Sequence, residues 1–171
     1  MKLSDNLVLA RSQSDRKAFL GLLGIIRHSA VKSAARRISE AMDVRKSGDD
    51  PAAGSLSGGN LQKFIVGREI RQDPRVMVAA QPTWGVDVGA SAQIRQALVD
   101  LRDRGCAVLV VSEELDELLE ICDRIAVIAN GRLSPAMPAA ELDAERIGLL
   151  MAGSQDDGHR TDGAGAAELP P

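Results

Sequence analysis

Apolar residues recur at a helical spacing in four stretches of this chain and form short continuous runs in three others. Within the helical stretches the apolar positions fall at i, i+3, i+4 and i+7, as at 94, 97, 98 and 101. The predicted helices are 30–44, 57–72, 89–104 and 114–122, and the predicted strands are Val76–Ala80, Ala107–Ser112 and Ile125–Ala129. Each helix therefore has one face to bury, and each strand is apolar on both faces.

From Ser57 onward the predicted helices and strands alternate. Strands that are apolar on both faces and alternate with helices are typical of a parallel sheet covered by helices on both sides, with right-handed crossovers. Asn130-Gly131 is a two-residue hairpin signal, so Arg132-Leu133 is expected to pair back on the preceding strand before a short helix at 144–151. The predicted fold class is α/β.

The chain divides into three parts by composition. Residues 1–54 are expected to be mainly helical and to end in a linker rich in Pro, Gly and Asp at 48–54. Residues 55–152 carry the alternating helices and strands. Residues 153–171 are dominated by Gly, Asp, Ala and Pro, and this tail is predicted to be disordered.

Composition narrows the class of protein. With 171 residues, 44% of them hydrophobic and 26% charged, the chain is long enough for one domain with a core. A net charge of -3 with scattered basic residues argues against nucleic acid as a partner. The longest apolar run, 19–26, is too short to span a bilayer, so we expect a cytoplasmic chain or one docked on a membrane through a partner.

Two cysteines and two histidines limit the available chemistry. Cys106 and Cys122 each adjoin an apolar segment and are predicted to be buried thiols, as in a reducing compartment. His28 lies in the basic N-terminal region and His159 in the tail. Neither a histidine metal site nor a histidine general base is therefore expected.

The most informative stretch is 56–63, Leu-Ser-Gly-Gly-Asn-Leu-Gln-Lys, in which Ser57-Gly58-Gly59 opens a predicted helix. The first backbone N–H groups of a helix have no partner within it, and the helix dipole places positive charge there. Since Gly58 and Gly59 have no Cβ, an oxyanion can come close to this backbone, and Ser57 can cap the helix or donate to the ligand. The segment taken alone is equally consistent with an ordinary turn before a helix.

Three motifs in order resemble those of ABC-type ATPase domains: Leu56-Ser57-Gly58-Gly59-Asn60, then Gln81-Pro82-Thr83, then Gly85-Val86-Asp87. More narrowly, the chain is similar over residues 3–152 to the second ATPase half of sugar and nucleoside importers, in which two halves share one polypeptide. The resemblance implies a partial P-loop NTPase fold, a parallel sheet with flanking helices plus a helical subdomain. It implies that 1–54 belongs to the helical subdomain and 55–152 to the C-terminal part of the ATPase domain.

The resemblance also implies roles for particular residues. Leu56 to Asn60 match the signature loop, which in this family caps the γ-phosphate of an ATP held by the opposite domain. Asp87 matches a loop that crosses the interface between the two domains. ATP and Mg²⁺ are thus expected to be held mainly by a partner half, and the implied nucleotide-binding residues of this chain are Ser57, Gly58, Gly59, Asn60, Gln62 and Asp87.

This sequence departs from the family pattern at its own catalytic positions. The family's Asp-Glu pair at the end of the Walker B strand is replaced by Ala80-Gln81, which offers neither a magnesium ligand nor a carboxylate base. Glu113 stands where a histidine is expected and brings negative charge toward a γ-phosphate. Gln81 and Glu113 are therefore expected to be inactive equivalents of catalytic residues, and no metal ligand is assigned.

The phosphate-holding loop Gly-x-x-x-x-Gly-Lys-Ser/Thr occurs nowhere in the 171 residues. The chain is therefore expected to be an N-terminally truncated half-domain, and a gene fragment, a misplaced start and a split gene all stay open. The acids Glu113, Glu114, Asp116, Glu117 and Glu120 are expected to be a solvated helix face, and not a metal or glycosidase site.

The expected function is that of a partial ATP-binding subunit of an importer for sugars or nucleosides, which supplies its signature loop to a partner half. The resemblance implies transmembrane permease subunits as partners, a solute-binding protein indirectly, and a position at the inner face of the plasma membrane. One alternative is a soluble ABC ATPase of translation or repair, against which the importer-like ending Leu150-Met151-Ala152-Gly153 argues. Another is a non-functional remnant.

The absence of a phosphate-holding loop predicts that the isolated 171-residue chain neither hydrolyses ATP nor binds it with useful affinity. The double change Ala80→Asp with Gln81→Glu should not restore turnover to this chain alone, because the loop that cradles the β- and γ-phosphates is still missing. Calorimetric titration tests this, and a micromolar dissociation constant, about -8 kcal/mol, would contradict it.

Overall fold

A computed structural model of the chain describes residues 1–10, 19–21 and 24–153. It divides into two compact units, Met1–Ile121 and Cys122–Pro171, each of which is described by itself. The predicted disordered tail lies outside the described residues except for Gly153. Among the residues described, no helix is long and apolar enough to cross a membrane.

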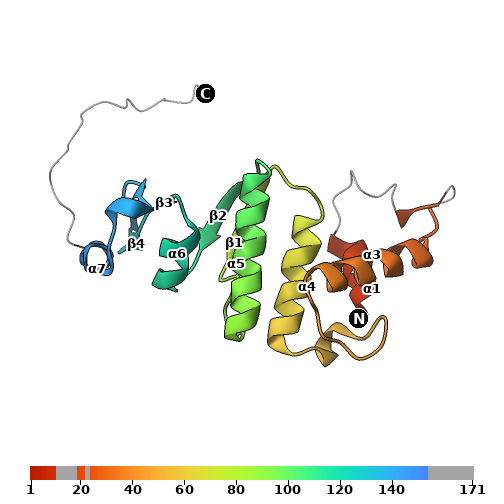
Figure 1. Cartoon of the computed structure of the whole chain (residues 1–171). Helices are drawn as coiled ribbons and strands as arrows, with labels where there is room; N and C mark the ends of the chain where they lie inside the picture. Colours follow the sequence, from red (N-terminus) through yellow and green to blue (C-terminus); the bar gives the residue numbers. More distant parts are fainter. Residues whose placement is uncertain (11–18, 22–23, 154–171) are drawn as a thin grey trace, which may run out of the picture. The chain divides into compact units, whose positions relative to one another are not determined.

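Among the described residues of the first unit, four longer helices form a packed series. In this series α1 (Leu3–Ala10) packs on α3 (His28–Ala41), α3 packs on α4 (Gly58–Ile70), and α4 packs on α5 (Val88–Asp103), as Figure 1 shows for α4 and α5. A short 3-10 helix, η2 (Ala53–Ser55), precedes α4, and α6 (Leu115–Ile121) ends the unit. The four predicted helices are confirmed with ends moved by one to three residues, whereas α1 had not been predicted.

The described part of this unit also contains two parallel strands. β1 (Val76–Ala80) pairs with β2 (Ala107–Val111) in a register that runs from Val76 opposite Ala107 to Ala80 opposite Val111. The helix α5 connects them and covers one face, where Met77 and Ala79 are buried. The prediction of a sheet covered on both faces is wrong for the described residues, because the residues of the other face are exposed.

The second unit is built from short antiparallel pairs. β3 (Arg124–Ile125) pairs with β6 (Met137–Pro138), and β4 (Ile128–Ala129) pairs with β5 (Arg132–Leu133), followed by η3 (Ala139–Glu141) and α7 (Ala144–Met151). The predicted hairpin at Asn130-Gly131 is confirmed, and both residues have positive φ angles.

The prediction of one parallel strand over Ile125–Ala129 is wrong. The chain turns back at Asn130-Gly131 and satisfies the backbone locally, since Ser134 donates its N–H to the Val127 carbonyl and accepts the Val127 N–H on Oγ. That exchange separates β3 from β4. An apolar run indicates that a segment is buried or paired. It does not indicate whether the strand that pairs with it runs parallel or antiparallel.

The core of the first unit is centred on Phe64, Ile94 and Leu101, which are almost fully buried. α4 approaches α3 at Gly67, where an added Cβ would lie 2.4 Å from Cγ of Met42 and 3.1 Å from Cγ2 of Ile38. Cys106 is a buried thiol as predicted, and the Cys122 thiol is partly buried.

Replacing Gly67 with alanine should lower the free energy of unfolding by about 1–3 kcal/mol, because the new methyl group must displace buried side chains of α3. Gly54→Ala is the matched control, since nothing lies within 4 Å of a Cβ built there. The control should stay within about 0.5 kcal/mol of the parent chain. Urea unfolding measures both, and an unchanged midpoint for Gly67→Ala would contradict the close packing.

Candidate functional site

The candidate site lies at the start of α4. Ser57 occupies the N-cap position with extended backbone angles, φ -65 and ψ 156, but its side chain makes no capping hydrogen bond. Gly58 and Gly59 form the first turn, with Gly58 exposed and Gly59 buried. The first-turn N–H groups therefore have no cap from Ser57, which leaves them available to an anion.

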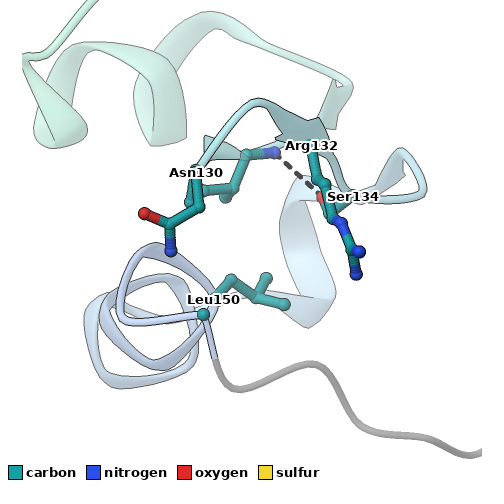
Figure 2. Close-up of a pocket in the computed structure, with 7 residues that line it drawn as sticks. Asn130, Arg132, Ser134 and Leu150 are labelled. Atoms are coloured by element: carbon teal, nitrogen blue, oxygen red, sulfur yellow. Dashed lines mark hydrogen bonds between the residues drawn. The ribbon is translucent and has the colours of Figure 1, made fainter.

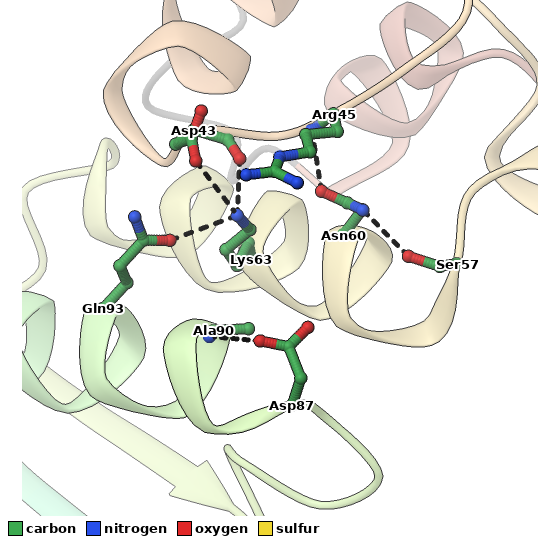
Figure 3. A network of polar contacts seen from close by, with 8 residues as sticks. All are labelled: Asp43, Arg45, Ser57, Asn60, Lys63, Asp87, Ala90 and Gln93. Atoms are coloured by element: carbon green, nitrogen blue, oxygen red, sulfur yellow. Dashed lines mark hydrogen bonds and ion pairs between the residues drawn. The ribbon is translucent and has the colours of Figure 1, made fainter.

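Asn60 holds the Ser57 hydroxyl in place. Its side-chain NH₂ donates to Oγ of Ser57 at 2.8 Å, and its side-chain oxygen accepts the backbone N–H of Arg45 at 2.7 Å (Figure 3). Since the Ser57 oxygen already accepts one hydrogen bond, its proton is free to point at a ligand. Gln62, the remaining predicted binding residue on α4, is partly buried.

A buried lysine fixes the same helix to its neighbours. The ammonium group of Lys63 donates to the backbone carbonyl of Asp43 and to Oε1 of Gln93 at 3.1 Å, and it lies 3.8 Å from the Asp43 carboxylate (Figure 3). It thereby joins α4 to α5 and to the segment after α3. The sequence assigns no role to Lys63, although this residue lies three residues after Asn60 and therefore on the same helix face.

The loop Gln81–Asp87, called the interface loop below, packs against the start of α4. A Cβ built on Gly58 would lie 3.7 Å from the Gly85 carbonyl oxygen, and one on Gly59 would lie 3.5 Å from Oδ2 of Asp87. Asp87 caps α5, because its Oδ1 accepts the Ala90 N–H at 2.9 Å (Figure 3). The structure therefore brings the predicted residues of α4 and Asp87 together within one unit.

Gln81 and Glu113 lie at the carboxyl ends of neighbouring strands. Gln81 follows β1 and donates its N–H to the Val111 carbonyl at 2.7 Å, and Glu113 is exposed two residues after β2. Gln81 has a φ of 49, a left-handed conformation that costs an ordinary residue about 1–3 kcal/mol. The side chain at this strand end is thus held in an unusual direction, but it carries an amide and no carboxylate.

Glu117 departs from the expected solvated acidic face. It is only 4% exposed, and its two carboxylate oxygens accept the hydroxyl groups of Thr83 and Ser112, each at 2.9 Å. Glu113, Glu114, Asp116 and Glu120 are exposed, as expected. The expectation is wrong for Glu117 because two hydroxyl donors replace the water that its charge would otherwise require.

A separate pocket of about 320 Å³ lies in the second unit (Figure 2). It is lined by Val127, Ala129, Asn130, Arg132, Ser134, Leu150 and Gly153, none of which is a predicted site residue. Ser134 is already engaged with Val127 there. Within the described ranges, no group of three or more His, Cys, Asp or Glu residues could hold a metal ion.

No protein-family model matches the chain. Curated proteins do. The nucleoside import ATP-binding protein NupA of Lactococcus lactis is 40% identical over 153 residues, 90% of this chain and 30% of that protein. The guanosine import ATP-binding protein NupO of Bacillus subtilis is 41% identical over 152 residues, 89% and 29% of the two chains. The glucose import ATP-binding protein TsgD13 of Haloferax volcanii is 47% identical over 131 residues, which are 75% of this chain and 24% of that protein.

This chain is a partial relative of the ATP-binding proteins of sugar and nucleoside ABC importers. The chain spans between 24% and 30% of the length of these three relatives, so it corresponds to part of such an importer protein.

Solved structures show that this chain has part of the fold of an ABC cassette. The ADP conformation of MJ1267, an ATP-binding cassette of an ABC transporter, gives a TM-score of 0.59 at 23% identity over 90% of this chain and 60% of that one. The dimeric structure of MJ0796, a bacterial ABC transporter cassette, gives a TM-score of 0.61 at 18% identity over 80% of this chain and 54% of that one. The predicted α/β class and cassette fold are confirmed.

Glu117→Ala should lower the free energy of unfolding of this chain by about 1–3 kcal/mol, because it leaves the Thr83 and Ser112 hydroxyls without their acceptor. Glu117→Gln should lower it less, since one acceptor oxygen stays. Asp116→Ala, an exposed acid on the same helix, is the control and should cost less than about 1 kcal/mol. Equal losses for Glu117→Ala and Asp116→Ala in thermal unfolding would show that the buried contacts are unimportant.

Proposed function

We propose that this chain supplies the signature side of a composite ATP site in an importer for sugars or nucleosides, and that a partner ATPase half holds the nucleotide. The observation that carries the proposal is the start of α4, where Ser57 and two glycines offer a hydroxyl and first-turn amides with no side-chain cap. Such a helix start fits a phosphate group, because it combines short-range donors with the positive end of a helix dipole.

The bound nucleotide would supply the phosphate group whose transfer drives transport, and the chain's own residues bind and orient it. Gly58 and Gly59 let the backbone approach the phosphate. The Ser57 hydroxyl donates a hydrogen bond to it, and Asn60 holds that hydroxyl in place. The Asp87 carboxylate lies nearby, but the Ala90 N–H that it accepts keeps it turned toward α5. Gln62 and Asp87 complete the proposed set of binding residues.

The chain's own hydrolytic site is proposed to be inactive. Ala80 gives no ligand for Mg²⁺, and Gln81 has no carboxylate with which to orient and deprotonate water. Glu113 is exposed at the neighbouring strand end and would repel transferring phosphate charge. These residues do not fit a magnesium ion, so the Mg²⁺ of the working site belongs with the partner half.

The proposed partners are a second ATPase half and transmembrane permease subunits, with a solute-binding protein indirectly and no nucleic acid. Docking on the permeases would place the chain at the inner face of the plasma membrane. The three relatives are all import proteins, which favours this function over a soluble ABC ATPase. The relatives act on nucleosides, guanosine and glucose, so the solute would be set by the other subunits.

Gly58→Asp should abolish ATP turnover in the assembled transporter that carries an intact partner half, because it adds a carboxylate and a side chain where a γ-phosphate must approach. Gln81→Ala should change turnover far less, since the site it belongs to is already inactive. Gly148→Asp is the control glycine, because nothing lies within 4 Å of a Cβ built there. Steady-state ATPase activity measures all three.

A crippling effect of Gln81→Ala together with a mild effect of Gly58→Asp would reverse the proposed division of labour. Normal activity in both variants would favour the alternative that the chain is a non-functional remnant.

A further inference from the structure

The buried carboxylate of Glu117 joins the interface loop to the end of β2. One carboxylate oxygen accepts the hydroxyl of Thr83 in the loop, and the other accepts the hydroxyl of Ser112, which directly follows β2, each at 2.9 Å. Glu117 is only 4% exposed. Withdrawing either donor would leave a buried carboxylate oxygen without a partner, which costs more free energy than an ordinary hydrogen bond contributes. The carboxylate therefore resists movement of the loop away from β2.

The interface loop depends on such an external contact because its own backbone is strained. Gln81 and Gly85 both have positive φ angles, 49 and 70, and only Gly85 lacks the Cβ that makes such angles unfavourable. Within the loop, the Trp84 N–H donates to the Gln81 carbonyl at 3.2 Å. The Val86 N–H donates to the Thr83 carbonyl at 3.3 Å. Both distances lie at or beyond the long end of the usual range, so the loop needs the support that the buried carboxylate gives at Thr83.

The loop in turn lies against the start of α4, where the proposed phosphate contacts are. A Cβ built on Gly58 would lie 3.7 Å from the Gly85 carbonyl oxygen, and one built on Gly59 would lie 3.5 Å from Oδ2 of Asp87. Thr83 precedes Gly85 by only two residues, so a shift of Thr83 moves the backbone that meets these glycines. The hydrogen bond to Thr83 therefore bears on the surface that a phosphate would meet.

We propose that Glu117 is a positioning residue of the composite ATP site. It holds Thr83 at the end of β2, and it thereby sets the place of the interface loop beside Gly58 and Gly59. Glu117 acts through Thr83 and binds no nucleotide itself. The effect on turnover rests on the proposed function, whereas the effect on the loop depends on this chain alone.

Trp84 makes the loop directly observable. It is the only tryptophan of a chain without tyrosine, and it is 78% exposed. Thr83→Val removes the hydroxyl group and keeps a branched side chain. In the full 171-residue chain, this variant should raise the amplitude of the fast local motion in the time-resolved fluorescence anisotropy of Trp84 about twofold, because the loop loses its anchor. Thr83→Ser keeps a hydroxyl and should retain the anisotropy decay of the parent chain.

Glu117→Gln tests the same contact from its other side, since an amide offers one acceptor oxygen for two hydroxyl donors. Combined with Thr83→Val, it should raise the fast motion by less than the sum of the two single effects, because both changes remove one contact. Asp116→Ala, an exposed acid on the same helix, is the control and should leave the decay unchanged. An unchanged decay in Thr83→Val, or an equal change in Asp116→Ala, would overturn the proposal.

Turnover is measured in the assembled transporter that carries an intact partner half. Thr83→Val should lower kcat about tenfold and leave KM for ATP nearly unchanged, because the partner half holds the nucleotide and the loop orients the surface that meets it. An unchanged kcat for Thr83→Val, while Gly58→Asp abolishes turnover, would overturn the positioning role and leave the proposed function standing. Full turnover in Gly58→Asp would overturn the proposed function, and with it the effect of Glu117 on turnover.

Discussion

The packing of α4 between α3 and α5 is the constraint on which the rest of the first unit depends. Gly67 lets α4 approach Ile38 and Met42 of the α3 region, and Phe64 fills the core. Lys63 then joins all three parts through Asp43 and Gln93. Because a buried ammonium group needs its partners, this lysine allows only a narrow range of positions for α4, and therefore for the start of the helix at Ser57.

The interface loop is held from both of its sides. Thr83 is bound by the buried carboxylate of Glu117, and Asp87 caps α5 beside Gly59. A loop held in this way keeps its shape without a bound nucleotide. In the proposed composite site, this loop would keep the surface that a partner's nucleotide meets, although Ala80 and Gln81 carry no charge.

The two faces of the β1–β2 pair have opposite surroundings in this chain. One face is buried under α5, and the other exposes Val78 and Leu109 although the strand sequences are apolar throughout. Strands that are apolar on both faces are typical of parallel sheets covered on both sides, and the described residues cover only one side of this pair.

The sequence by itself determined four helices from 28 to 121, the bounds of β1, the Asn130-Gly131 hairpin and the helix start at Ser57-Gly58-Gly59. Periodicity, turn chemistry and glycine backbone freedom are local properties, which is why they can be read from the sequence. Only the tertiary structure decided what Ile125–Ala129 pairs with, that Glu117 is buried, and that Asn60 and Lys63 fix α4. Each of these depends on which groups distant segments bring within hydrogen-bond distance. A strand accepts a partner in either direction, and a carboxylate on a helix is buried only where donors such as Thr83 and Ser112 meet it.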